Sequence, residues 1–145
     1  MNIKLVEHIY FVGIGGIGMS ALARYCNAKG KKVSGYDKTP SSITDALTAE
    51  GISLHFDENH IPKYIKDADF QSVLIVYTPA VSQDSPQLTS FASKKWTVLK
   101  RAELLGVITE DAYTIAVAGT HGKTTTSCIL AHILKYSDIY CTAFL

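Results

Sequence analysis

The sequence predicts a doubly wound α/β domain with a mostly parallel, Rossmann-like sheet, followed by the start of a second, truncated α/β domain. Two observations support this class. Strand-like apolar segments alternate with segments of helical periodicity over residues 9–105. Two glycine-rich turns, near residues 13–18 and 119–124, each join a strand-like segment to a helix-like one. We therefore expect a first domain over residues 1–108 and the opening of a second over 109–145.

The first half of the chain predicts three strands and three helices. Apolar residues with β-branched or aromatic side chains favour strands, whereas an apolar spacing of three and four favours helices. Gly30 and Gly51 follow two of the helical segments, as a glycine often does after the last helical turn. Pro62 is tolerable only in the first turn of a short, weaker helix. The expected order is strand 9–12, helix 17–29, strand 32–36, helix 43–50, strand 52–56 and helix 61–68.

The second half continues the alternation and then begins it again. Residues 72–77 are mostly apolar, which is typical of a parallel strand buried on both faces. Pro86 suits the first position of a helix that reaches about residue 94. A fifth strand at 97–100 and one or two helical turns at 101–105 complete the first domain. After a polar joint at 109–111, we expect a new strand over 113–118 and a helix from about 124 to 135.

The first glycine-rich turn has the spacing of a nucleotide-binding loop. Gly13, Gly15 and Gly18 match G-x-G-x-x-G between a predicted strand and a predicted helix. In such a loop the glycines permit the turn and let backbone N–H groups approach a diphosphate at the start of the helix. Asp37 ends the next strand, about 20 residues on, where an acidic side chain holds a ribose hydroxyl.

The second turn, Gly119-Thr120-His121-Gly122-Lys123-Thr124, is a shortened P-loop in which Val117 stands where the full motif has glycine. Backbone N–H groups of such a loop surround phosphates, its lysine neutralises phosphate oxygens and its threonine hydroxyl binds Mg²⁺. Phosphoryl transfer also needs an acidic Mg²⁺ ligand on a later strand. Since only one helix and a short tail follow, we expect the chain to be a fragment that ends early in its second domain.

Composition limits the possible partners. The chain has 145 residues, with 14 basic and 13 acidic side chains and a formal net charge of +1. This balance does not favour nucleic acid or an anionic membrane, and no apolar run has the length of a membrane span. Three scattered cysteines, at positions 26, 128 and 141, suit a reducing compartment, so we expect a cytoplasmic protein.

Taken together, the two glycine-rich loops and Arg101-Ala102-Glu103-Leu104-Leu105 between them resemble the Mur ligases over essentially the whole chain. The resemblance implies a three-domain enzyme with a UDP-sugar domain, a central ATPase domain and an amino-acid-binding domain. It implies ATP-dependent ligation of L-alanine to UDP-N-acetylmuramate through an acyl phosphate, with ATP and Mg²⁺ as cofactors, in peptidoglycan synthesis. A homodimer is compatible with it, and the fragment alone is expected to be inactive.

Carried over motif by motif, the resemblance assigns two sets of residues. The expected UDP-sugar residues are Gly13, Gly15, Gly16, Ile17, Gly18, Asp37, Thr78 and Arg101. The expected ATP residues are Gly119, Thr120, His121, Gly122, Lys123, Thr124 and Thr125, with Lys123 and Thr124 catalytic and Thr124 on Mg²⁺. Thr78-Pro79 replaces the Ser-Ser-Ala-type loop common in the family, and neither His55 nor His60 matches a histidine that the family tends to carry.

Three other functions remain open at this point. The first loop and Asp37 fit a nicotinamide-dependent dehydrogenase equally well, and a nucleotide-sensing domain is a non-enzymatic reading. The Gly-Lys-Thr loop argues against both, because neither class uses it. Within the family, a recycling ligase that attaches a whole peptide to the same UDP-sugar is a close alternative.

Overall fold

The computed structural model describes residues 3–110 and 112–144. The chain forms two compact units, Met1–Glu110 and Asp111–Leu145, each with its own internal contacts. The first contains every strand of the described residues, and the second contains a single helix.

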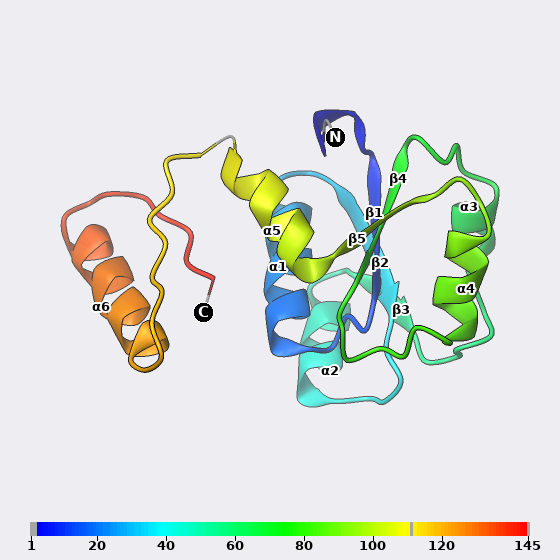
Figure 1. Ribbon diagram of the computed structural model, residues 1–145, viewed down its shortest axis with the longest axis horizontal. Coiled ribbons are helices and arrows are strands. Elements are labelled where there is room, and N and C mark those ends of the chain that lie inside the picture. Colours follow the sequence, from blue (N-terminus) through cyan, green and yellow to red (C-terminus); the bar gives the residue numbers. More distant parts are fainter. Residues whose placement is uncertain (1–2, 111, 145) are drawn as a thin grey trace. The chain divides into compact units, whose positions relative to one another are not determined.

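The first unit is built on a five-stranded parallel sheet (Figure 1). Its strands are β1 (His8–Val12), β2 (Lys32–Tyr36), β3 (Ser53–His55), β4 (Val73–Tyr77) and β5 (Thr97–Lys100). Their spatial order is β3-β2-β1-β4-β5, so β1 lies at the centre and pairs with both β2 and β4. The predicted doubly wound α/β class is confirmed.

Helices cover both faces of this sheet (Figure 1). A short 3₁₀ turn (Ile3–Leu5) precedes β1. Helices α1 (Ile17–Ala28), α2 (Ser42–Ala49) and α5 (Arg101–Glu110) lie on one face, and α3 (Lys63–Lys66) and α4 (Pro86–Ala92) lie on the other. The side of the connecting helix changes between β3 and β4, which makes the boundary between β1 and β4 the switch point of the fold.

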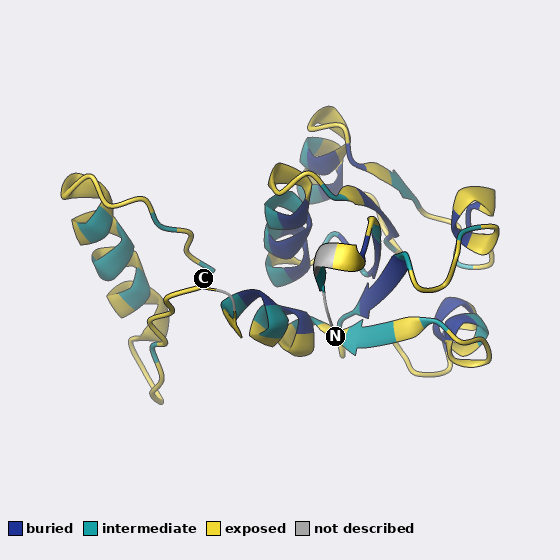
Figure 2. Ribbon diagram, turned by 90° about the horizontal axis from the view of Figure 1, so that it is seen from above, coloured by how far each residue is buried: buried dark blue, intermediate teal, exposed yellow. Residues whose placement is uncertain are grey.

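The alternating side chains of β1 fill both cores. Tyr10 and Val12 pack with Ile65 of α3 and Phe91 of α4, whereas Ile9 and Phe11, of opposite parity, point to the other face. These four β1 side chains are fully buried. In Figure 2 the strands at the centre of the sheet are dark blue, the colour of buried residues. Burial of such side chains stabilises a fold by roughly 1.5–3 kcal/mol each, so the central strand anchors both layers.

Gly35 of β2 is required by this packing. A Cβ at Gly35 would lie 2.5 Å from the backbone oxygen of Phe11 and 2.9 Å from Ile14 Cδ1. No side chain fits there without moving β1 or the chain that follows it, because backbone atoms cannot yield as a side-chain end can. The glycine therefore lets β2 pair closely with β1 just before the glycine-rich turn.

Helix α2 begins at Ser42, one residue before the expected start at residue 43. Ser41 caps it, since the backbone N–H of Thr44 donates to Ser41 Oγ at 3.3 Å and the backbone N–H of Ser41 donates to Thr44 Oγ1 at 2.7 Å. This reciprocal pair satisfies two backbone donors at the start of the helix. It also fixes Thr44, which is fully buried, against the glycine-rich loop.

Helix α5 is longer than predicted. It begins at Arg101 and continues to Glu110, through residues 109–110 that were expected to form a polar joint. Leu104 and Ile108 are buried one turn apart, so the helix keeps a contact with the core after residue 105. A spacing of four on one helix face explains why the helix continues.

In the second unit, helix α6 (Lys123–Tyr136) agrees with the expected helix, but the predicted strand over 113–118 is wrong. These residues are irregular, and Tyr113 is 97% exposed. A β-strand is stabilised by hydrogen bonds to neighbouring strands, and none of the described residues of this unit offers such a partner. The apolar pattern of residues 113–118 favours a strand, but a strand forms only where a sheet provides neighbouring strands.

None of the helices formed by residues 3–110 and 112–144 combines the length and apolar character that a membrane span requires.

The three cysteines are free thiols in different environments. Cys26 is buried in α1, Cys128 is exposed on α6 and Cys141 is partly exposed.

Candidate nucleotide site and phosphate loop

The glycine-rich turn lies at the carboxyl end of β1, next to the carboxyl end of β4. In open α/β sheets this switch point is where ligands bind. Six of the residues predicted to hold a UDP-sugar meet here in three pairs, each formed by a glycine of the turn and a side chain from another element. The pairs are Gly13 with Thr78, Gly15 with Asp37 and Gly18 with Arg101.

Gly15 and Asp37 form the first polar contact of the site. The backbone N–H of Gly15 donates to Asp37 Oδ2 at 2.6 Å, and the backbone N–H of Thr39 donates to the other carboxylate oxygen at 3.3 Å. A Cβ at Gly15 would lie 2.8 Å from Asp37 Oδ2 and 2.9 Å from Thr44 Cγ2. Asp37 thus places a negative charge beside Gly15, where it favours a ribose hydroxyl and repels a phosphate.

Gly18 lies under the guanidinium group of Arg101. A Cβ at Gly18 would lie 2.8 Å from Arg101 Nη1, so a larger residue would displace the guanidinium group from this position. Within the described residues, the guanidinium group of Arg101 makes no hydrogen bond or ion pair, and the N-cap Gly16 gives helix α1 no side-chain cap. A cation held at the positive end of a helix is electrostatically unfavourable unless an anion lies between them. This pairing therefore forms a site suited to a phosphate group.

The rest of the turn shapes the entrance to this site. Gly13 has φ +85°, a left-handed conformation that favours glycine. A Cβ added at Gly13 would lie 2.9 Å from Thr78 Cγ2. Gly16 is exposed, and Ile17 is 75% exposed although it is apolar. An apolar side chain left in solvent beside backbone donors is available to cover a bound ligand.

The second glycine loop precedes α6. Gly122 is the N-cap of that helix, with φ +74°, and the ammonium group of Lys123 donates to the backbone oxygens of Gly119 at 2.7 Å and Thr120 at 3.3 Å. Lys123 is therefore turned back over the loop. Thr120, His121, Thr124 and Thr125 are exposed, so their side chains are available to a ligand.

A buried polar network, which the sequence analysis missed, lies beneath the carboxyl ends of β1 and β3. The Tyr10 hydroxyl donates to Gln87 Oε1 at 3.0 Å and lies 2.8 Å from His55 Nε2. Because the hydroxyl has one proton, His55 Nε2 donates to it. Gln87 Nε2 donates in turn to the backbone oxygen of His60 at 3.1 Å. The network fixes the loop that follows β3.

Burial shifts the pKa values of this network. It raises the pKa of Tyr10 far above its usual value, and it lowers the pKa of His55, with a further lowering from the neighbouring His60. Both groups are therefore neutral at pH 7. The rings of His55 and His60 meet edge to face at 5.3 Å, and His55 Nδ1 is buried without a partner among the described residues. Tyr10, His55 and Gln87 lie far apart in the sequence, so no local sequence pattern predicts the hydrogen bonds that join them.

Among the residues that the structure describes, no three His, Cys, Asp or Glu side chains gather in a way that could hold a metal ion. The one predicted Mg²⁺ ligand, Thr124, stands in the first turn of α6 next to Lys123. A threonine hydroxyl at the start of a helix fits the part that this residue plays in a P-loop.

Comparison with known proteins identifies a family for this chain. Residues 8–113 match the family described as "Mur ligase family, catalytic domain". The chain is 57% identical over 143 residues to a protein of Porphyromonas gingivalis named UDP-N-acetylmuramate–L-alanine ligase, and 52% identical over 145 residues to one of Flavobacterium psychrophilum with the same name. It spans about a third of the length of these relatives, 31% and 32% respectively.

Solved structures show the same fold. The chain matches the UDP-N-acetylmuramate–alanine ligase of Thermotoga maritima with a TM-score of 0.74 and 32% identity, covering 90% of this chain and 30% of that one. It also matches a murein peptide ligase of Psychrobacter arcticus with a TM-score of 0.79 and 28% identity, covering 91% of this chain and 27% of that one.

Proposed function

Because the chain belongs to the Mur ligase family, we propose that it binds the UDP-sugar and the ATP phosphates for a ligase that joins L-alanine to UDP-N-acetylmuramate. The observation that supports this most directly is the unpartnered Arg101 guanidinium over Gly18, at the start of α1. That arrangement suits the diphosphate of a UDP-sugar. The names of the 57% and 52% identical relatives supply the substrate class.

In this proposal two charged side chains beside the loop after β1 bind different parts of the nucleotide. Asp37, beside Gly15, takes a ribose hydroxyl, since a carboxylate accepts hydrogen bonds from hydroxyl groups. The backbone N–H groups of Gly16, Ile17 and Gly18, together with Arg101, take the diphosphate. Thr78 lies at the edge of the same site, against Gly13.

The second loop takes the phosphates of ATP. Lys123 already faces the backbone oxygens of the loop, so its charge lies where phosphate oxygens would replace them. Gly119, Thr120, His121, Gly122 and Thr125 provide the surrounding backbone and hydroxyl groups, and Thr124 would hold Mg²⁺. When bound, Mg²⁺ neutralises charge that builds on the phosphate oxygens.

The reaction needs an activated carboxylate, because an amine does not displace oxide from a carboxylate ion. The muramyl carboxylate attacks the terminal phosphorus of ATP, and ADP leaves as an acyl phosphate forms. The alanine amine then attacks the acyl carbon, loses a proton and expels phosphate as the amide bond forms. Nucleotide substrates and three free cysteines favour the cytoplasm as the place of this step in peptidoglycan synthesis. We expect the 145-residue chain alone to release no phosphate in response to alanine.

The decisive experiment is a titration of this chain with UDP-N-acetylmuramate and, separately, with NADH. We expect saturable binding of the UDP-sugar and none of NADH. The family match does not favour a nicotinamide-dependent dehydrogenase or a nucleotide sensor. Binding of NADH with no response to the UDP-sugar would refute the proposal.

One observation supports a second candidate within the family. The fold also matches murein peptide ligases, from Psychrobacter arcticus and from Neisseria meningitidis, with TM-scores of 0.79 and 0.77. Among the solved structures the alanine ligase is 32% identical and these two proteins are 28% and 26% identical, a small difference. Alanine is favoured by the relatives at 57% and 52% identity, which are both named as alanine ligases. The full-length ligase should therefore consume ATP with L-alanine and not with a tripeptide.

A further inference from the structure

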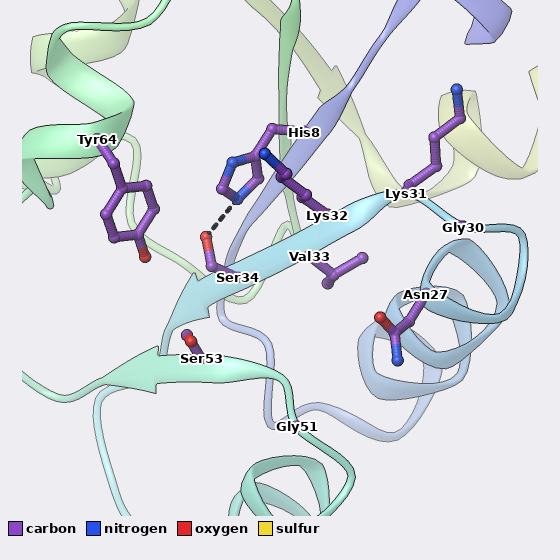
Figure 3. A pocket seen from close by; sticks show the side chains of 10 residues that line it. All are labelled: His8, Asn27, Gly30, Lys31, Lys32, Val33, Ser34, Gly51, Ser53 and Tyr64. Carbon is purple, nitrogen blue, oxygen red and sulfur yellow. Dashed lines mark hydrogen bonds between the residues drawn. The ribbon is translucent and has the colours of Figure 1, made fainter.

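A cavity lies at the edge of the sheet opposite the glycine-rich turn (Figure 3). It has a volume of about 450 Å³. Its polar lining comes mainly from residues at or near the amino ends of β1, β2 and β3 and from the end of α1. The lining residues are His8, Asn27, Gly30, Lys31, Lys32, Val33, Ser34, Gly51, Ser53 and Tyr64. Since the strands are parallel, this edge is separated from the nucleotide site by the length of β1.

The charge of this cavity is one-sided. Its lining contains two lysines and a histidine and no carboxylate. Lys31 directs its ammonium group to the backbone oxygen of Val6 at 2.6 Å. The nearby carboxylate of Glu50 is held by Arg24 at 2.7 Å and so does not neutralise the cavity. Positive charge with no facing carboxylate favours an anionic ligand.

The hydrogen-bonding groups of the cavity are already oriented. His8 Nε2 lies 2.8 Å from Ser34 Oγ, and Ser34 is 2% exposed, so this pair is held inside the fold (Figure 3). The ring of Tyr64 lies almost parallel to His8, at 7° and 5.5 Å between centroids, and is 50% exposed. Figure 3 shows the Lys32 and Ser34 side chains on the side of β2 that faces His8.

We propose that this cavity binds a small anion with phosphate or carboxylate groups, through Lys32 and His8, with Ser34 holding the His8 ring in place and Tyr64 beside it. Phosphate and carboxylate share the chemistry that these groups recognise, namely oxygen atoms that carry negative charge and accept hydrogen bonds. The site is separate from the UDP-sugar site and does not depend on the function proposed above.

The pKa of His8 reports directly on binding at this site. Burial lowers the pKa of His8, and the charge of Lys32 lowers it further. An anion beside both groups offsets the charge of Lys32 and stabilises the protonated imidazole, so binding raises the pKa of His8. Binding at the nucleotide site leaves this pKa unchanged because that site lies at the other end of β1.

The test is an NMR titration of the whole chain with inorganic pyrophosphate and, in a second arm, with citrate, at constant ionic strength. We expect at least one arm to saturate at about 1 mM or below and to raise the pKa of His8. The arm that binds more tightly identifies the anion class. A linear, non-saturating response in both arms, or shifts confined to residues 13–18, overturns the proposal.

A pair of lysine variants tests the role of the residues. Lys32→Gln removes an exposed charge from the cavity, and we expect it to weaken binding about tenfold, the effect of one lost charged hydrogen bond. Lys95→Gln makes the same change on an exposed loop outside the lining and should leave binding unaltered. Equal weakening by both variants would mean that only net charge matters and would overturn the proposal. Ser34→Ala changes a buried position, so its effect on anion binding is measured only if this variant keeps its fold.

Discussion

The backbone N–H of Gly15 and the carboxylate of Asp37 meet at 2.6 Å, which joins the turn after β1 to the end of β2. This hydrogen bond fixes a negative charge beside one glycine of the turn. Arg101 places a positive charge beside another, Gly18. In the proposed function these two charges orient the nucleotide, with its sugar hydroxyl groups toward Asp37 and its diphosphate toward Arg101.

Gly15→Ala should disturb both the fold and the site. The new Cβ would lie 2.8 Å from Asp37 Oδ2 and 2.9 Å from Thr44 Cγ2, and Thr44 is fully buried. We expect a loss of about 1–3 kcal/mol in the free energy of unfolding, as for other overpacked sites, and loss of UDP-sugar binding. Chemical denaturation and calorimetry measure the two effects.

Gly106→Ala is the matched control for this change. Gly106 lies within α5 and has no atom within 4 Å of an added Cβ. Alanine in a helix interior is favoured over glycine by about 1 kcal/mol, so this variant should become more stable. Destabilisation of both variants to the same extent would contradict the role given to the space around Gly15.

Arg101→Ala should weaken UDP-N-acetylmuramate binding about 10- to 100-fold, the range for loss of a charged hydrogen bond. Because the Arg101 side chain has no hydrogen-bond or ion-pair partner among the described residues, the free energy of unfolding should change little in this variant. Arg24→Ala is the control, since Arg24 forms an exposed ion pair with Glu50 that contributes little to stability. Isothermal calorimetry on both variants decides the matter, and an unchanged affinity in Arg101→Ala removes this residue from the site.

Stability should fall in mild acid. The pKa values of His8 and His55 are lowered in the folded protein, chiefly by burial, so the unfolded chain binds more protons near pH 6. Stability is then fully present above the unfolded pKa of about 6.5 and decreases as pH falls below it. Lys32 and Tyr64 face His8, and His60, Asp57, Tyr10 and Tyr36 surround His55.

Denaturation curves between pH 8 and pH 5, values chosen to bracket that pKa, measure this dependence. His55→Gln should flatten it, because glutamine does not titrate in this range. An equally steep curve for the variant would show that His55 does not contribute. His121→Gln, at an exposed position of the second loop, is the control and should follow the original curve.

The thiols should react in a fixed order. Burial raises the pKa of Cys26 to about 12, so this thiol is both inaccessible and protonated, whereas Cys128 is exposed. Iodoacetamide at pH 8 should therefore alkylate Cys128 first, Cys141 more slowly and Cys26 only after unfolding. Mass spectrometry of peptides gives the order, and early modification of Cys26 would contradict the packing of α1.

Much of the first unit could be predicted from the sequence because its signals are local. The run before Gly13 is apolar and β-branched, and the glycine spacing marks the turn, so β1 and α1 were located to within one residue of their ends. Ser41 and its capping partner likewise lie three residues apart. The contacts of Arg101 with Gly18 and of Tyr10 with Gln87 depend on the tertiary fold, so their geometry could not be predicted.

The strand expected over 113–118 failed for a related reason. Its residues favour extended structure, but a strand also needs neighbours, and such neighbours are a property of a whole sheet. Helix α6 was predicted correctly because its hydrogen bonds are internal. The membership of each residue in the two phosphate-binding sites stays a prediction, to be tested by the variants above.

The central position of β1 has a consequence for how the first unit folds during synthesis. Strand β1 leaves the ribosome first and can pair with β2 as soon as α1 has formed, but its other edge waits for β4, made after β2, β3 and three helices. Until then a strand with four side chains that are fully buried in the finished fold has an open edge, the kind of surface through which nascent chains aggregate. Chaperone demand should thus be greatest before Tyr77 emerges and should fall once β4 closes that edge.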